Sequence, residues 1–253
     1  MSERESANHS WTASCVHTPV LVPVKASEPL LRFMQTADEV HYRPTLELTS
    51  RTVLAYCELH RCNYSYFLGV MRGSHPSQAT YNRILLLKRL ADTGYPGWAC
   101  YMDADAFIAD LSFDLRKYLA DKADVALIAA PGGGPLWWQV NSGVVLINLG
   151  HRCGRVIVDC WWDAFQRIDC ERLQSATQSH EAADDQTLLW ESLQSIPGAE
   201  RAVHVDRQSL FNYDGRFIQH LGSGQGTLRE RLAALQAKVQ SVLAATSAHR
   251  SGV

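Results

Sequence analysis

The chain has 253 residues, which is enough for one α/β domain with a substantial hydrophobic core. Hydrophobic residues make up 46% of the sequence and charged residues 20%, and the formal net charge of −2 argues against nucleic acid or an anionic membrane as a partner. Residues 1–18 are polar, unlike a signal peptide, and no apolar run approaches the roughly 18 residues of a membrane helix. We therefore expect a cytoplasmic protein with no transmembrane segment and no nucleic-acid partner.

Helices are predicted where apolar residues recur every three or four positions, and strands where short runs are apolar, aromatic or β-branched. In chain order, the predicted elements are a strand at 19–24, helices at 28–37 and 45–60, a strand at 64–71, a helix at 78–91, strands at 97–102, 125–130 and 143–149, helices at 151–169 and 184–195, and a strand at 202–205. This alternation predicts an α/β fold with a mostly parallel central sheet covered by helices on both faces. Residues 1–17 are predicted to form a flexible tail, and residues 18–226 a single domain.

The last segment, 227–253, is predicted to be an amphipathic helix followed by a short tail. Its apolar residues follow a spacing close to a heptad over 227–245. The helix could pack on its own domain, which is the simpler interpretation, or pair with a second copy in a homodimer.

Two acids, Asp103 and Asp105, follow the predicted strand at 97–102 in the sequence WACYMDADAFI. In an extended chain, residues two positions apart point to the same side, and ligands of open α/β sheets bind beyond the carboxyl ends of the strands. Two carboxylates at that place form an oxygen-rich site that suits Mg²⁺ or Mn²⁺. Such a cation could bridge the diphosphate of a nucleotide-sugar and neutralise the charge on the leaving group.

Other interpretations of this D-x-D motif are open. The motif also occurs in solvated turns and at helix N-termini, and phosphatases of the haloacid-dehalogenase type carry it after a hydrophobic strand. In those phosphatases a Thr or Val usually follows the second Asp, whereas Ala106 and Phe107 follow it here. A D-x-D phosphatase is therefore the less favoured alternative.

Several further short motifs occur in a fixed order along the chain. They are Tyr56–Tyr64 (YCELHRCNY), Tyr81-Asn82-Arg83, Asn141–Ile147 (NSGVVLI), Asp184-Asp185-Gln186, Phe211-Asn212-Tyr213 and Ile218–Gly222 (IQHLG). With the D-x-D motif, their order resembles GT-A glycosyltransferases, in particular the family of fungal α-galactosyltransferases and plant xyloglucan xylosyltransferases. The chain departs from that family in having Arg83 in place of a Lys, and Asn148-Leu149 in place of an Arg-Asn pair.

The resemblance implies a GT-A (Rossmann-like) fold and a metal-dependent glycosyltransferase. Such an enzyme transfers a hexose or pentose from a nucleotide-sugar donor, with UDP as the expected nucleotide, to a carbohydrate or other hydroxyl acceptor. Retention of the anomeric configuration is the expected outcome. The expected cofactor is Mn²⁺ or Mg²⁺. A non-catalytic scaffold that keeps the fold and binds nucleotide-sugar is the alternative from a different functional class.

The same resemblance assigns roles to individual residues. The implied metal ligands are Asp103, Asp105 and His220. The implied contacts to the nucleotide-sugar are Tyr56, Arg83, Asp103, Ala104 and Gly222. The implied catalytic residues are Asn141, Asp185 and Gln186.

Each of these residues also has a structural interpretation. Tyr56 could belong to the core, Arg83 to the surface, Asn141 to a turn, and Asp185 to a helix N-terminus. An inverting enzyme would instead require a carboxylate base, for which Asp110 or Asp185 are the candidates.

A glycine run at 132–134 precedes two tryptophans, Trp137 and Trp138. Tryptophan rings offer faces on which sugars stack, so this segment could form an acceptor-side loop. An equally good interpretation is a tryptophan pair that covers the sheet.

Overall fold

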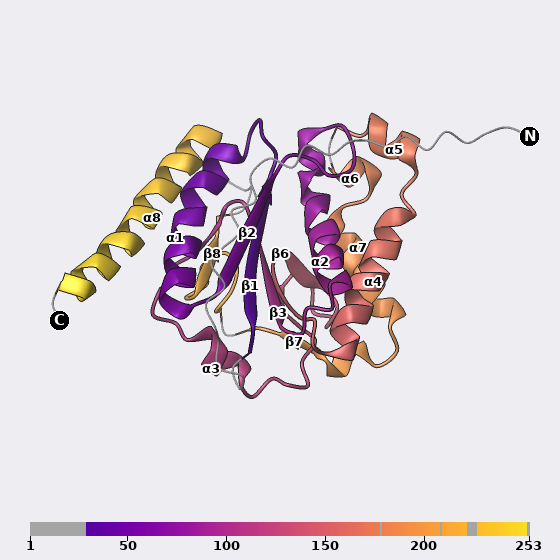
Figure 1. Ribbon diagram of the computed structural model, residues 1–253. Coiled ribbons are helices and arrows are strands. Elements are labelled where there is room, and N and C mark those ends of the chain that lie inside the picture. The colour runs from indigo at the N-terminus through magenta and orange to yellow at the C-terminus, as the bar shows by residue number, and fades with distance from the viewer. Residues whose placement is uncertain (1–28, 178, 208, 222–226, 252–253) are drawn as a thin grey trace, which may run out of the picture.

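The computed structural model describes residues 29–251 except residues 178, 208 and 222–226. A six-stranded sheet lies between two layers of helices (Figure 1), and a two-stranded sheet lies beside it. The strands of the large sheet, in spatial order, are β2 (Asn63–Leu68), β1 (Leu31–Ala37), β3 (Trp98–Asp103), β6 (Val140–Asn148), β5 (Leu127–Pro131) and β7 (Val203–Val205). The small sheet pairs β4 (Ala106–Ile108) with β8 (Ile218–His220).

The helices surround the sheet in an order that follows the chain. They are α1 (Arg43–His60), the 3-10 helix η1 (Pro76–Tyr81), α2 (Asn82–Asp92), α3 (Leu115–Leu119), α4 (Arg152–Gln166), α5 (Cys170–Ser175), α6 (Ser179–Ala182), α7 (Asp185–Ser195), the 3-10 helix η2 (Ala199–Arg201) and α8 (Leu228–Ser251). None of the helices in this described part of the chain is both long enough and apolar enough to cross a membrane.

The large sheet is mostly parallel, as predicted. Strands β2, β1 and β3 pair in parallel, and so do β5 and β7. Only β6 runs antiparallel, against both of its neighbours. Because β6 is antiparallel to β3, the first residues of β6 lie beside the last residues of β3, where the two acids are. The two elements can therefore contribute residues to one site.

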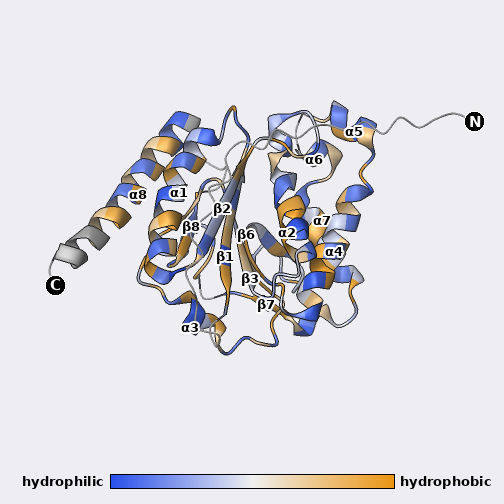
Figure 2. Ribbon diagram, viewed as in Figure 1, coloured by the Kyte–Doolittle hydropathy of each residue, from blue (hydrophilic) through white to orange (hydrophobic). Residues whose placement is uncertain are grey.

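Helices cover both faces of the sheet, with α1 and α8 on one side and α2, α4 and α7 on the other (Figure 1). Each interface is a separate apolar cluster. Phe33, Met102 and Leu146 point toward the α1 side, whereas Met34, Tyr101 and Val145 point toward the α2 side. Successive strand residues alternate between the two faces, so both sets are buried and the strands read as nearly continuous apolar runs. Figure 2 shows the complementary pattern on helices α1 and α4, which carry hydrophilic and hydrophobic residues on different sides.

The helix predicted at 28–37 is wrong, because residues 31–37 form β1, an interior strand of the sheet. All but one of its seven residues are buried, since helices lie over both faces of the sheet at this strand. A fully buried strand shows no alternation of polar and apolar residues, and its short apolar run also fits a helical spacing. The predicted strand at 19–24 lies outside the described residues, and so does the tail at 1–17.

The helix predicted over 227–245 is present as α8, and it lies along α1 (Figure 1). Its residues Leu235 and Val239 are buried and pack against Phe107 of β4. The apolar seam of the helix therefore contacts its own domain, as the simpler interpretation predicts. A homodimer through this helix stays a prediction.

Candidate metal centre

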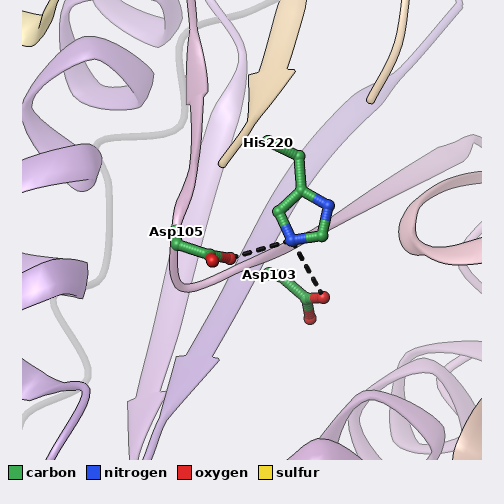
Figure 3. A group of neighbouring side chains, drawn as sticks. All are labelled: Asp103, Asp105 and His220. Atoms are coloured by element: carbon green, nitrogen blue, oxygen red, sulfur yellow. Dashed lines mark ion pairs between the residues drawn. The ribbon is translucent and has the colours of Figure 1, made fainter. Parts of the chain in front are cut away.

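Asp103, Asp105 and His220 come together at the carboxyl end of β3 (Figure 3). The Nε2 atom of His220 lies 2.9 Å from Oδ1 of Asp105 and 3.6 Å from Oδ2 of Asp103. Each residue offers one ligand atom, and the three ligand atoms all lie within 4.8 Å of one another. Two ligands that bind one cation at about 2.1 Å and at right angles are about 3 Å apart, so these separations suit a shared cation.

Strand pairing explains why residues so distant in sequence meet. Strand β3 ends at Asp103, the chain turns at Ala104 and Asp105, and β4 then pairs antiparallel with β8. In this register Ala106 lies opposite His220. The imidazole is thus placed beside the carboxylates by the backbone of the small sheet.

Two fully buried polar side chains, Gln35 of β1 and Thr49 of α1, hydrogen-bond to the backbone of the turn between β3 and β4. The Gln35 amide donates hydrogen bonds to the carbonyl oxygens of Asp103 and Ala106, each at 3.0 Å. The Thr49 hydroxyl donates to the carbonyl of Ala104 at 2.7 Å. Backbone carbonyls that would otherwise be buried without partners are satisfied, and the acids are fixed in position.

Asn212 orients the imidazole from the other side. Its Oδ1 lies 2.8 Å from Nδ1 of His220, so an N–H at Nδ1 can donate to it. With that N–H in place, the neutral imidazole can present Nε2 to a cation on the side of the two carboxylates, and the protonated ring donates from Nε2 to Asp105. The ring of Tyr213 stacks on the imidazole with centroids 5.9 Å apart and planes 15° apart.

Gly143 makes room for this arrangement at the start of β6. A Cβ atom at this position would lie 2.7 Å from Cε1 of His220 and 2.9 Å from Oδ2 of Asp103. Both separations are shorter than side-chain packing allows. Any residue other than glycine would push the imidazole away from the carboxylates.

The second oxygen of Asp103 belongs to a buried ion-pair network centred on Arg83. The guanidinium donates to Oδ1 of Asp103 at 2.6 Å, and it lies 3.1 Å from Oδ2 of Asp185. It also donates to the carbonyl and hydroxyl oxygens of Ser142, whose hydroxyl in turn donates to Asp185 at 2.8 Å. Arg83 is almost completely buried and stacks over Tyr101, so its planar fork is fully engaged within the protein.

These contacts shift the protonation equilibria of the site. Burial raises the pKa of the Asp103 carboxyl to about 6, although the charge of Arg83 opposes the shift. Burial acts in the same direction on Asp105, but the hydrogen bond and charge of His220 outweigh it and hold that pKa below its ordinary value. Burial lowers the pKa of His220, but Asp105 and Asp103 together leave it above its ordinary value. At a pH below these pKa values, a cation that enters the site displaces a proton.

The three residues line one end of a cleft with a volume of about 680 Å³. Its other walls come from the end of β1 and the segment that follows it, and from η1 with the N-terminal turn of α2. This volume lies within the range of about 300–1,000 Å³ that is typical of small-molecule sites. The cleft lies beyond the carboxyl end of β3, where open α/β sheets bind their ligands.

The donor set fits a divalent cation such as Mn²⁺. Two carboxylate oxygens suit Mg²⁺, Mn²⁺ and Ca²⁺, whereas an imidazole nitrogen favours transition metals. Mn²⁺ is the member of the first group that also accepts nitrogen. The tautomer set by Asn212 and the space left by Gly143 are the features that such a ligand set requires.

Of the other predicted site residues, some line the cleft and others lie next to it without lining it. Ala104 and Arg83 line the cleft. Asp185 is buried beneath Arg83, and Gln186 accepts a hydrogen bond from the backbone N–H of Ser142. Asn141 accepts from the N–H of Gly143, so it shapes the start of β6 rather than facing the cleft. Asp185, Gln186 and Asn141 therefore contact Arg83, Ser142 and Gly143 and do not line the cleft themselves.

One predicted contact is not formed. Tyr56 is fully buried on the α1 side of the sheet, where its hydroxyl donates to the carbonyl of Phe113 and its ring stacks on His60. It does not line the cleft. Tyr56 lies on the buried face of α1, and its ring therefore packs in the core. Gly222 lies outside the described residues.

Trp137 and Trp138 are half-buried and pack against the core cluster on the α2 side of the sheet. Their rings meet edge to face, with centroids 5.6 Å apart. This packing agrees with a tryptophan pair that covers the sheet.

Four side chains that support the site, Gln35, Thr49, Ser142 and Asn212, were given no role from the sequence, although Ser142 and Asn212 belong to the motifs quoted above. A signal for Thr49 is present, because Thr45, Thr49 and Thr52 fall on the buried face of α1, where apolar residues are the rule. Gln35 shows the same signal, as a lone amide within the apolar run of β1.

Comparison with known proteins gives no match to any family model and none to a curated protein. Solved structures do match. A glycosyltransferase involved in the glycosylation of the major capsid of PBCV-1 superposes with a TM-score of 0.60 at 14% identity, over 82% of this chain and 100% of that one. The chain has a GT-A glycosyltransferase fold. The predicted fold is thereby confirmed.

Two further glycosyltransferases superpose on this GT-A fold less closely. The glycosyltransferase GlyE of Streptococcus pneumoniae has a TM-score of 0.48 at 14% identity, over 86% of this chain and 64% of that one, so the chain spans less than two thirds of that protein. The Drosophila β-1,4-galactosyltransferase 7, in complex with manganese, UDP-Gal and xylobiose, has a TM-score of 0.43 at 6% identity, over 80% of this chain and 79% of that one.

Proposed function

We propose that this chain is a metal-dependent glycosyltransferase that moves a hexose or pentose from a nucleotide-sugar, with UDP as the nucleotide, to an acceptor hydroxyl. The observation that carries the proposal is the convergence of Asp103, Asp105 and His220 at the end of a cleft of about 680 Å³. Two carboxylates and an imidazole with a fixed tautomer form a cation site, and the cleft provides the space for a nucleotide-sugar.

When bound, Mn²⁺ would neutralise the diphosphate and the charge that develops on the leaving nucleotide. Asp103, Asp105 and His220 would hold the cation. Arg83 keeps the Asp103 carboxylate in place through a 2.6 Å hydrogen bond, and Asp185 fixes Arg83 in turn. Asp185 is therefore a positioning residue in this proposal, and Gln186 and Asn141 support the start of β6.

We propose retention, because neither carboxylate that the sequence suggested as an inverting base, Asp110 or Asp185, lines the cleft. Among the described residues that line it, Asp38, Asp103 and Asp105 carry a carboxylate. The last two belong to the metal site. Asp38 accepts hydrogen bonds from the backbone N–H groups of residues 40–42, so it caps the segment after β1. The exposed Asp214 lines an adjoining hollow and is the carboxylate that an inverting mechanism would have to use.

A nucleotide-sugar screen tests the proposal. Thermal unfolding is measured with UDP-glucose, UDP-galactose, UDP-xylose and the corresponding GDP-sugars, each with and without Mn²⁺. A donor at 100 times its dissociation constant should stabilise the protein by about 2.7 kcal/mol. The stabilisation should require Mn²⁺ and should disappear in Asp105→Asn, which keeps the size of the side chain but removes its charge.

Turnover separates the competing functions. Release of UDP in the presence of Mn²⁺ supports a transferase, and an NMR time course of the product then reports retention or inversion. Binding without turnover across a broad set of acceptors would instead support the scaffold. Hydrolysis of p-nitrophenyl phosphate without any nucleotide-sugar would support the phosphatase.

A further inference from the structure

A second hollow opens beside the metal cleft. It has a volume of about 380 Å³ and lies where β5 and β7 end, between Pro131 and the segment 206–215. Tyr213 lines both this hollow and the cleft, so the two spaces share a wall at this side chain. Asn212, which binds the metal-site imidazole, also lines the hollow. A molecule held here would lie next to the reacting end of a donor in the cleft.

The lining of the hollow combines hydrogen-bonding groups with apolar surface. Arg207, Ser209 and Asp214 are exposed and polar, whereas Phe211 and Pro131 contribute apolar atoms. Carboxylates accept hydrogen bonds from hydroxyl groups, and a guanidinium donates to them. A polyhydroxylated ligand can satisfy both kinds of group at once.

The exposed charges of the hollow are balanced. Asp214 supplies one carboxylate and Arg207 one guanidinium, whereas Asp206 is buried and accepts a hydrogen bond from the N–H of Leu210. A lining with one exposed charge of each sign suits a neutral sugar, whose hydroxyl groups both donate and accept hydrogen bonds.

Tyr213 adds an aromatic surface at the boundary between the two spaces. Its ring is 59% exposed although it stacks on His220. Asn212 adopts a left-handed conformation, with φ at 75°, and its amide turns inward to the imidazole. The next residue, Tyr213, is presented outward. Tyrosine combines an apolar ring with a polar hydroxyl, which suits the apolar face and the hydroxyl rim of a sugar.

We propose that this hollow is the acceptor subsite, and that it takes a neutral carbohydrate whose ring packs on Tyr213 and whose hydroxyls bind Asp214 and Arg207. The inference rests on the proposed transferase function, because it is the shared wall at Tyr213 that brings an acceptor hydroxyl to the donor. Positioning the two reactants side by side is itself a large part of catalysis for a bimolecular transfer.

The test uses the full chain and four simple acceptor probes, the methyl glycosides of glucose, galactose, mannose and xylose. Saturation-transfer NMR measures their binding in the presence of UDP with Mg²⁺ or with Mn²⁺. We expect at least one glycoside to bind, and its resonances to broaden with paramagnetic Mn²⁺ but not with Mg²⁺. Broadening would place the sugar close to the metal.

Two variants probe the lining. Tyr213→Ala removes the ring and should weaken glycoside binding about tenfold, whereas Tyr213→Phe keeps the ring and should restore most of the affinity. Asp214→Asn changes an exposed side chain, and should also weaken binding about tenfold by removing a charged acceptor. The matched control is Asp124→Asn, the same change at an exposed position before the start of β5, whereas the hollow lies at the end of that strand.

The outcomes separate the two proposals. If no glycoside binds, or if binding survives unchanged in both Tyr213→Ala and Asp214→Asn, the acceptor subsite is not in this hollow. Mn²⁺-dependent binding of the nucleotide-sugar, measured on the same samples, reports the transferase proposal independently. Loss of glycoside binding in Asp214→Asn with donor binding intact would support the subsite.

Discussion

The two oxygens of Asp103 face two different environments. Oδ1 contacts a closed network in which Arg83 is paired with Asp103 and Asp185, with Ser142 filling the remaining hydrogen bonds. Oδ2 faces an open group of ligands at the end of the cleft, where Asp105 is the second carboxylate and the imidazole of His220 lies close to both. One side of the carboxylate is saturated by the protein, and the other is available to a ligand.

The difference assigns separate roles to the two sides. A buried guanidinium held by several hydrogen bonds fixes a carboxylate in position and opposes the rise of its pKa on burial. Two carboxylates that share one titratable imidazole, by contrast, form a site in which a divalent cation can replace a proton. The closed side should therefore govern stability, and the open side should govern metal binding.

The largest effect is expected on the closed side. Arg83→Met removes the guanidinium that pairs with the buried Asp185 and the partly buried Asp103, and should lower the free energy of unfolding by about 3–5 kcal/mol. Urea denaturation measures the change. The control is Lys88→Met on the same helix, where partly exposed ion pairs to Asp92 and Asp159 should be worth only about 0–1 kcal/mol. Equal losses in the two variants would show that the Arg83 network is no more important than a surface pair.

The next effect concerns the orientation of His220. Asn212→Gly removes the acceptor of Nδ1 but tolerates the positive φ, and it should weaken Mn²⁺ binding about 10–100-fold, as loss of an outer-sphere partner of a metal ligand does. Ser209→Gly is the control, because Ser209 also has a positive φ and has no contact with the imidazole among the described interactions. Manganese EPR gives both affinities. Unchanged affinity in Asn212→Gly would remove Asn212 from the site.

The pH dependence of metal binding follows from the open side. Mn²⁺ requires Asp103 ionised and His220 neutral. The pKa of Asp103 is raised to about 6 and that of His220 lies above its ordinary value, so both groups take up protons as the pH falls. Mn²⁺ affinity should therefore decrease by about tenfold or more from about pH 7.5 to about pH 5.5. Calorimetry at several pH values would detect it, and a constant affinity across that interval would contradict the proposed ligand set.

The smallest effect on Mn²⁺ affinity is expected from Thr49, which supports the turn between β3 and β4. Thr49→Val removes the hydroxyl that holds the carbonyl of Ala104, and Mn²⁺ affinity should fall severalfold, by about 1 kcal/mol. Thr52→Val is matched, because Thr52 is equally buried on the same helix but accepts from the N–H of Ile108 in β4. Both variants should lose similar stability in urea, and only Thr49→Val should lose metal affinity. Thr49→Ser, which keeps the hydroxyl, should restore the affinity.

The sequence predicted the parts of this molecule that depend on local pattern. The α/β fold, most of its helices and strands, and the acids after β3 follow from hydrophobic spacing and from the rule that ligands bind beyond carboxyl ends. Strand β1 was missed because burial on both faces removes the alternation that identifies a strand.

The parts that the sequence did not predict depend on contacts between distant elements. Gln35 and Thr49 meet the metal-binding turn only because β1 lies next to β3 and α1 packs against β1 and β4. The sequence also does not show that the two oxygens of Asp103 have different partners, because Arg83, Asp185 and His220 come from three different elements. Tyr56 shows the opposite error, since its motif suggested a ligand contact and its ring is in the core.

The most direct test of the central claim is titration of the metal-free protein with Mn²⁺ by calorimetry and EPR. The convergence of Asp103, Asp105 and His220 predicts one ion per chain, with binding lost in His220→Ala and kept in His204→Ala on β7. Absence of binding by the unaltered protein, or binding that His220→Ala leaves unchanged, would contradict it.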